Sequence, residues 1–440
     1  VTSWTGLTTL TLVVIALTIG RRTREAKPLV YLALIGISVS AYEFLYYQIA
    51  GLPDTAQFIA IATLGAAIVY NYRWLEHWLT DYLNLTKREV AFFAHTHWGL
   101  SSFVWLSAIV MFSERLTEAS SLGSIDLIGV GTGVFLTNYA LLQGRFPEFK
   151  EGEADPRDRR EAVQTAETWV YISMVEATAV GFYVFGYLPS NLQEMFIAWG
   201  GAIACVAAYF LDVFPWDRWG WPLRPWRLMA RLLPGLVITA TGLGFFGGIN
   251  QVWSVSALIV AAFYVYLSYF HRQIRLTYWS AILINWVILL ELVRALVMEP
   301  IAYTIPLAAT VLYFAQVEPT LQPSHRKELR HWIRILAIAS VSLTSLITNH
   351  WLISGIVSFL IGVAGLSLRI RAFLYVGTIT FLLNAAYQLI ILNALYSFLR
   401  WVIGLVVGIG CIWIAATVET RREQLVTLLQ NWRVELESWD

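Results

Sequence analysis

The chain has 440 residues, of which 58% are hydrophobic and only 13% charged. A soluble globular protein carries about 25% charged residues, so this composition excludes an ordinary soluble enzyme, a disordered protein and a nucleic-acid-binding protein with a basic face. The 30 Lys and Arg residues balance 29 Asp and Glu residues, so the net charge does not indicate a partner. The composition predicts an all-α membrane protein.

Apolar stretches of the length that crosses a bilayer, about 20 residues each, recur from one end of the chain to the other. We predict about 15 transmembrane helices. Their limits are 4–20, 29–50, 56–79, 90–112, 124–143, 164–187, 193–213, 228–248, 252–270, 277–298, 301–317, 332–348, 351–368, 372–393 and 397–418. The two cysteines lie inside such stretches, so neither a disulfide framework nor a Cys metal site is predicted.

The basic residues indicate the topology, because Lys and Arg are retained on the cytoplasmic side of a membrane. All but three of the 30 lie at the junction between an odd-numbered stretch and the next one, or in the tail after the last. The exceptions are Arg115, Arg294 and Arg400. One missed or surplus helix would destroy this alternation. The N-terminus is therefore predicted outside and the C-terminus in the cytoplasm.

One arrangement recurs along the chain: a span, a short basic loop, and a second span with a polar residue deep inside. That residue is Glu43, Glu176, Glu291 or Gln388. The repeat predicts units of four helices, with three in the first; either the chain is the C-terminal part of a longer protein or the first unit lost a helix. The predicted segments are 1–86, 87–218 with a cytoplasmic loop over 145–163, 219–322, 323–418, and a cytoplasmic helix over 419–440.

Ionisable groups inside a bilayer are costly and are functional candidates by default. Besides the three glutamates, Arg294 lies inside a predicted span, three residues after Glu291, so the two can neutralise each other. Because one unit carries Gln388 instead of a glutamate, hydrogen bonding between packed helices is the favoured interpretation. Ion or proton handling and contact with a ligand are the alternatives.

Two histidines, His95 and His97, open the predicted span 90–112. Two positions apart on a helix, they point to different sides and cannot chelate one metal from one face. Each could ligate a pigment such as chlorophyll or haem, and the alternative is an ordinary hydrogen bond at the start of a helix. No metal site and no other cofactor is predicted.

Enzyme signatures are absent from the sequence: it has no phosphate-binding loop, HExxH, nucleophile elbow or CxxC. The acidic residues Glu114, Glu118 and Asp126 on one predicted outer loop could hold a metal in an enzyme acting on lipid-linked glycans. Their spacing matches no motif, and a solvated loop is the favoured interpretation. We therefore expect a protein that is not an enzyme.

The tail over 419–440 is predicted to be an amphipathic helix. Its three basic and five acidic residues give a net charge of −2, and anionic lipid attracts basic rather than acidic helices. We therefore expect the apolar stripe to dock on a protein partner. The stripe consists of Leu425, Leu428, Leu429, Trp432, Leu436 and Trp439.

The segment from 373 (Phe-Leu-Tyr-Val-Gly-Thr) to 423 (Glu-Thr-Arg-Arg-Glu at its end) resembles the C-terminal end of large, uncharacterised, repeat-containing polytopic membrane proteins of cyanobacteria. The Ser-Ala-Tyr-Glu sequence over 40–43 is similar to their internal repeats. The resemblance implies no activity. It implies the thylakoid or plasma membrane of a cyanobacterium, with a photosystem or related assembly among the partners.

The favoured function is a non-enzymatic membrane scaffold or accessory subunit that associates with a larger, photosynthetic membrane complex. The second interpretation is a transporter or channel that uses Glu43, Glu176 and Glu291. The third is a lipid-linked glycan enzyme with a site on the outer face. The expected partners are membrane lipids and another integral membrane complex, and no nucleic acid.

The topology can be tested with tags in the predicted outer loops. Labels around Asp54, Ser121, Pro189 and Glu299 should react only from outside, and a label at the C-terminus only from the cytoplasm, because the basic loops stay inside. Labelling of the tail from outside in intact cells would refute the count of 15 spans.

Overall fold

The computed structural model describes residues 3–20, 27–113, 123–146, 156–243, 251–323, 326–347, 351–395, 397–420, 427 and 430–432. The described residues form helices and no strand. The helices are α1 (Ser3–Gly20), α2 (Lys27–Ile49), α3 (Asp54–Trp74), α4 (Glu76–Leu83), α5 (Lys87–Ser113), α6 (Ser124–Gln143), α7 (Pro156–Phe185), α8 (Ser190–Val213), α9 (Leu223–Gly242), α10 (Gln251–His271), α11 (Leu276–Arg294), α12 (Pro300–Val317), α13 (Lys327–Ile347), α14 (Trp351–Leu368), α15 (Arg371–Leu395) and α16 (Ser397–Thr420), with short 3₁₀ turns at Trp216–Trp219 and Pro319–Leu321.

Nine helices in the described part of the chain are long and apolar enough to cross a membrane: α2, α3, α6, α7, α8, α10, α11, α12 and α15. This finding indicates a membrane protein, as the composition predicts. Shorter apolar segments lie in α1, α14 and α16. The first turns of α5 and α13 are charged, and α9 carries three arginines. The count of 15 spans, the topology and the repeat remain predictions.

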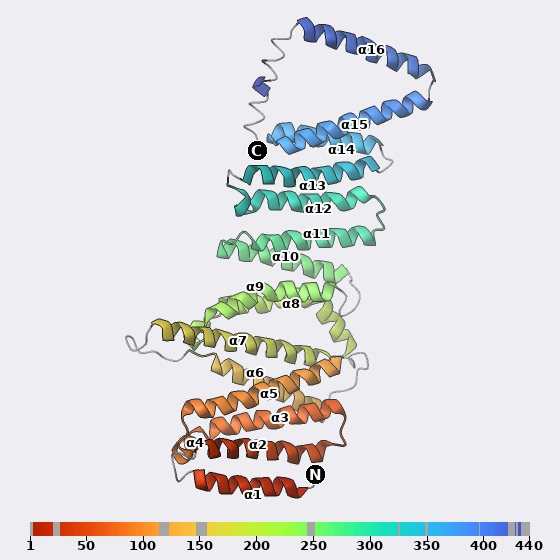
Figure 1. Ribbon diagram of the computed structural model, residues 1–440. Helices are drawn as coiled ribbons and strands as arrows, with labels where there is room; N and C mark the ends of the chain where they lie inside the picture. Colours follow the sequence, from red (N-terminus) through yellow and green to blue (C-terminus); the bar gives the residue numbers. More distant parts are fainter. Residues whose placement is uncertain are drawn as a thin grey trace. The chain divides into compact units, whose positions relative to one another are not determined.

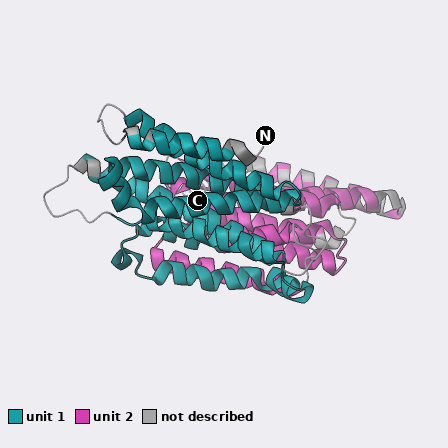
Figure 2. Ribbon diagram, turned by 90° about the horizontal axis from the view of Figure 1, so that it is seen from below, with its two compact units in different colours: residues 1–233 teal, residues 234–440 magenta. Residues whose placement is uncertain are grey.

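The chain divides into two compact units, residues 1–233 and 234–440, coloured teal and magenta in Figure 2. Within unit 1, the most extensive contacts join α1 with α2, α3 with α5, and α6 with α7. Within unit 2, they join α10 with α11, α12 with α13, and α14 with α15. In both units, helices that follow one another closely in the chain therefore pack as antiparallel neighbours (Figure 1).

The predicted span 56–79 is wrong in one respect, because the helix does not continue through it. Leu75, with φ −88° and ψ 8°, separates α3 from the short helix α4. The charged Glu76 follows directly and pairs with Arg73 at 3.1 Å. Beyond the break, α4 buries Leu79 and Leu83 in the core of unit 1. Burial of such a leucine contributes roughly 1.5–3 kcal/mol, which favours a separate amphipathic turn over a longer apolar span.

The predicted cytoplasmic loop over 145–163 is shorter in the structure, because α7 begins at Pro156. Proline is well suited to the first position of a helix, since its fixed φ is already helical and the missing N–H would have no partner there. Charged residues dominate the following two turns, and this polarity conceals the helix from a search for apolar stretches.

The packing of α5 on α6 depends on one glycine. A Cβ atom at Gly133 would lie 2.2 Å from the indole of Trp105, which is 1% exposed. The same indole donates a hydrogen bond from Nε1 to the carbonyl oxygen of Gly129 at 2.8 Å. A side chain at Gly133 would displace this buried tryptophan, so the two helices can approach this closely only with glycine there.

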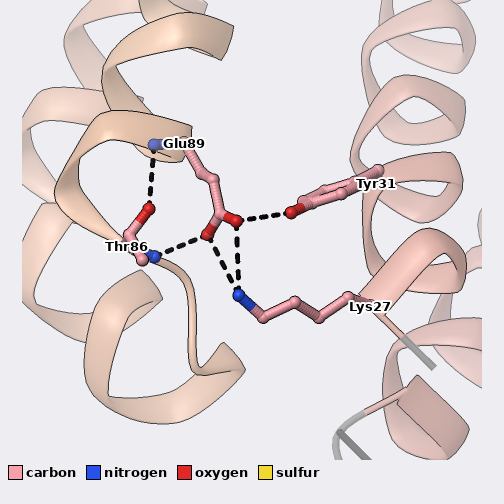
Figure 3. A network of polar contacts seen from close by, with 4 residues as sticks. All are labelled: Lys27, Tyr31, Thr86 and Glu89. Carbon is pink, nitrogen blue, oxygen red and sulfur yellow. Dashed lines mark hydrogen bonds and ion pairs between the residues drawn. The ribbon is translucent and has the colours of Figure 1, made fainter. Parts of the chain in front are cut away.

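Glu89 connects the beginning of α5 to the beginning of α2 (Figure 3). Its carboxylate accepts hydrogen bonds from the Tyr31 hydroxyl at 2.6 Å and from the Thr86 backbone N–H at 2.6 Å, and it pairs with the Lys27 ammonium at 3.2 Å. Its own N–H donates to Thr86 Oγ1, which completes a capping box. These bonds, led by that from Tyr31, lower the pKa of Glu89 to about 2.

A second acid has the same kind of partners at the end of α12. Glu318 accepts from the Tyr278 hydroxyl at 2.6 Å and pairs with Arg275 at 3.0 Å, both from the start of α11. The hydrogen bond from Tyr278 is the largest cause that lowers the pKa of Glu318 to about 2. In both places, a base and a tyrosine at the start of one helix hold an acid on a later helix, three helices later for Glu89 and one helix later for Glu318.

The Glu89 network should make stability depend on acid pH. An unfolded glutamate has a pKa of about 4.3, so the lowered folded value stabilises the protein above that pH, and the stabilisation is lost as the pH falls toward 2. Glu89→Gln should lower the melting temperature at pH 6, and its difference from the wild type should shrink between about pH 4.3 and 2. Tyr31→Phe should weaken the same dependence. A difference that stays constant with pH would contradict this assignment.

Candidate functional site

The polar residues inside the apolar helices are the candidate functional positions, and Glu176 on α7 is the most enclosed of them. It is 2% exposed. Its Oε1 accepts a hydrogen bond from the Ser102 hydroxyl of α5 at 2.5 Å, whereas its Oε2 is buried and lacks a hydrogen-bond partner among the described residues. A carboxyl group in this position joins two helices through one oxygen.

Glu291 on α11 has a different environment, because a base lies one turn away on the same helix. Arg294 Nη1 donates to Glu291 Oε1 and, at 2.9 Å, to the Ser254 hydroxyl of α10. Ser254 in turn donates to Glu291 Oε1 at 2.7 Å. The opposite charges of Glu291 and Arg294 balance each other, and Ser254 bonds to both.

Gln388 on α15 lies beside a cavity of about 470 Å³ in unit 2. The buried residues Ser345, Ser354 and Asn384 also line it, and the two serine hydroxyls lie 3.3 Å apart. Glu43 is half-buried on α2. The four predicted positions thus have four environments, and in two of them the glutamate accepts a hydrogen bond from a serine of another helix.

His95 and His97 point to different sides of α5, as their spacing predicts. His95 Nδ1 lies 3.1 Å from the Tyr139 hydroxyl of α6, and its ring packs against Trp169 of α7. His97 Nε2 lies 3.0 Å from the Ser38 hydroxyl of α2, and its Nδ1 is buried. With Nε2 within hydrogen-bond distance of Ser38 and Nδ1 buried, His97 in this arrangement does not fit the role of an axial ligand. At His95, only Nε2 remains a candidate.

The acids considered for an outer-face enzyme do not form a site in the described residues. Asp126 caps the start of α6: it accepts from the Gly123 N–H at 2.9 Å and from the hydroxyls of Tyr183 and Tyr187. Glu114 and Glu118 lie outside the described residues. Within the described ranges, no three His, Cys, Asp or Glu residues lie close enough together to hold a metal ion.

The tail lies mostly outside the described residues. Of the predicted docking stripe, only Trp432 is described, and its side chain is 56% exposed. The rest of the stripe is not described: Leu425, Leu428, Leu429, Leu436 and Trp439.

Sequence reasoning missed the neutral residues that partner the charged ones. Ser102 and Ser254 look unremarkable in apolar stretches, because serine is tolerated there without a special role. Asn285 was also missed, although a buried amide within the apolar helix α11 is a signal that a search for neutral polar residues would find.

Comparison with known proteins adds nothing to these positions: no family model, curated protein or solved structure matches the chain.

If the buried acids serve to join helices, Glu176→Gln and Glu291→Gln should fold and assemble with near-normal yield, because an amide can still bond to the serine. Hydrogen bonds between membrane helices contribute about 0.6 kcal/mol on average, so the loss of stability should be of that order. Thermal unfolding in detergent would measure it, with Ser102→Ala as the matched change on the partner helix. Normal folding combined with abolished ion flux in reconstituted Glu176→Gln would instead favour transport.

Proposed function

We propose that the protein is a non-enzymatic membrane scaffold or accessory subunit, built of four-helix repeats, that binds another integral membrane complex through α16 and the following tail. The observation that carries this proposal is the exposure of α16. Among the described helices, α15 is the only one with which α16 makes more than marginal contact. Large side chains project from it into open surroundings, with Phe398 75% and Trp401 82% exposed.

Lipid can cover apolar side chains, so exposure alone does not indicate a partner. The glycines of α16 favour coverage by a protein partner over coverage by lipid. Gly404 and Gly408 form a GxxxG pair, which permits close approach of a second helix, and a Cβ atom built at either would meet nothing within 4 Å. By contrast, a Cβ atom at Gly377 of α15 would lie 2.5 Å from the backbone of Gly362 in α14. The α14–α15 pair uses its glycines for close packing, and those of α16 are available to a helix from another chain.

The acidic tail supports the same conclusion. Its apolar stripe cannot remain in water without cost, since burial of each large side chain is worth roughly 1.5–3 kcal/mol. Its net charge of −2 disfavours an anionic lipid surface. A protein surface next to α16 would cover both the stripe and the glycine pair.

The proposed architecture is 15 spans with the N-terminus outside, in three complete four-helix units and a first unit of three helices. The alternating basic junctions support the topology. The tight pairs α1–α2, α6–α7, α10–α11 and α14–α15 support the repeat, because each joins the two spans on either side of the predicted basic loop: the second and third spans of each complete unit, and the first two of the unit with three. The resemblance to cyanobacterial proteins suggests a thylakoid or plasma membrane, with a photosystem or related assembly as the partner.

A transporter or channel is the second candidate, favoured by Glu176. A buried carboxyl group that keeps one oxygen without a partner is the kind of group that carries protons or ions in membrane proteins. The paired Glu291 lacks this property, so a pathway along all the intramembrane glutamates is disfavoured.

The scaffold proposal predicts that α16 and the tail are needed for assembly into a larger complex. Gly404→Leu with Gly408→Leu, and separately Leu429→Asp with Trp432→Ala, should shift the protein in native gels from a high-mass complex to a smaller species while it still inserts. The matched control is Gly131→Leu on α6, where a Cβ atom also meets nothing within 4 Å; it should leave the complex intact. An unchanged mass in both double variants would refute docking through this end.

A further inference from the structure

A groove of about 440 Å³ lies between α11 and α12 of unit 2. Both helices are apolar enough to cross a membrane, and only 22% and 11% of the residues in their apolar windows are buried within the chain. Part of the groove wall is apolar, formed by Val265, Ala281, Ile284, Ile288, Pro306 and Ala309, and the polar residues that line the rest are Thr277, Ser280, Asn285, Thr310 and Tyr313. A groove between two helices of this kind opens toward the acyl chains of the bilayer.

The floor of the groove contains a buried amide whose orientation can be derived. Asn285 Nδ2 lies 3.1 Å from the carbonyl oxygen of Pro306 and 2.8 Å from Thr310 Oγ1. A carbonyl oxygen can only accept, so the side-chain atom that faces it must be the NH₂ group. Thr310 donates its own hydrogen to Pro306 O at 3.0 Å and therefore accepts from Asn285. The network has a single consistent assignment, with Oδ1 of Asn285 as an acceptor.

That acceptor lacks a protein partner. Asn285 is 6% exposed, and Oδ1 is a buried atom with no hydrogen bond within the described residues. Buried polar atoms in folded proteins nearly always have a partner, so the groove should contain a group that donates a hydrogen bond to this oxygen. At the end of the groove, Tyr313 donates to Thr277 Oγ1, which donates to the carbonyl oxygen of Ile274, so this pair of hydroxyls has used its hydrogens.

The amide of Asn285 occurs in only one of the four predicted units. Asn285 lies six residues before the intramembrane position Glu291. At the same distance before the other intramembrane positions, the chain has Ile37, Val170 and Leu382. The amide joins α11 to α12 through Nδ2, a bond that the three apolar residues cannot make, and it adds an acceptor, Oδ1, that this bond does not use.

We propose that the groove binds a neutral lipid alcohol, such as a diacylglycerol, whose hydroxyl donates to Asn285 Oδ1 while its chains lie along the apolar walls. No charged residue lines the groove in the described chain, which disfavours phosphate or ammonium headgroups. The volume is in the range of small-molecule sites, about 300–1,000 Å³. This binding does not depend on the partner complex proposed for α16.

The test uses the full-length protein in nanodiscs and two photoactivatable probes, a diacylglycerol with a diazirine in one acyl chain and its methyl ether. The ether carries a methyl group in place of the hydroxyl hydrogen and therefore cannot donate a hydrogen bond. The diacylglycerol should label peptides from α11 and α12 about two to ten times more strongly than the ether, the effect of one neutral hydrogen bond. Comparable labelling by the two probes, or labelling by neither, would mean that the groove holds only water or passing acyl chains, and would overturn the proposal.

Two variants separate the amide from the groove as a whole. Asn285→Leu should abolish the preference for the hydroxyl probe, whereas Asn384→Leu, which removes another buried amide of unit 2, should retain it. Ala309→Phe should reduce labelling by both probes, because it narrows the groove without replacing a hydrogen-bonding group. Retention of the hydroxyl preference in folded Asn285→Leu would refute the assignment of this residue as the acceptor.

Discussion

The cost of an unsatisfied polar group in an apolar surrounding governs this structure. Within hydrocarbon no water can bond to the backbone, so a chain of this composition must satisfy its N–H and C=O groups internally, and helices do so within a single segment. The same constraint acts on side chains. Glu176 receives a hydrogen from Ser102, Glu291 is held by Ser254 and Arg294, and the Trp105 indole finds the Gly129 carbonyl. Where a buried acceptor lacks a hydrogen-bond donor within the described residues, as Oδ1 of Asn285 does, the same constraint indicates a donor from a bound molecule.

The constraint also separates two kinds of connection between helices. In the apolar segments, glycines allow close packing: the indole of Trp105 lies against Gly133, and the backbones of α14 and α15 approach each other at Gly362 and Gly377. At the helix ends, where water is available, charged groups hold the helices, as Glu89 and Glu318 do with a base and a tyrosine each. Glu89 and Glu318 thus pair with bases where solvation limits the cost of charge, whereas glycines allow close approach within the apolar segments.

The positions of most helices could be predicted from the sequence, because apolar runs of about 20 residues are typical of helices that cross a membrane. The runs give the positions of the helices to within a few residues. The break at Leu75 was missed because Trp and Leu residues continue through it, although Arg73 and Glu76 interrupt the apolar run there; beyond it, α4 buries Leu79 and Leu83. The start of α7 was missed for the opposite reason, because a charged helix contains no apolar signal.

The candidate sites were less predictable, since their character depends on pairing across helices. The spacing of Glu291 and Arg294 suggests their contact, but the involvement of Ser254 requires the packing of α10 on α11. The surroundings of the His97 nitrogens could not be inferred either, because Nε2 meets Ser38 of α2, more than fifty residues earlier in the chain. Whether a pigment could reach a ring nitrogen of His97 could therefore be judged only from the structure.

The order of residues in the two acid networks bears on how the chain is made. Lys27 and Glu89 are 62 residues apart, and a ribosome adds about 5–20 residues per second. Several seconds therefore pass between the synthesis of Lys27 and that of Glu89. Arg275 likewise precedes Glu318. A basic side chain that emerges first can stay at the anionic headgroups until the acid arrives, and an acidic one would be repelled from them. Each helix start can therefore remain anchored at the membrane surface during synthesis and receive its partner only when the later helix has been inserted.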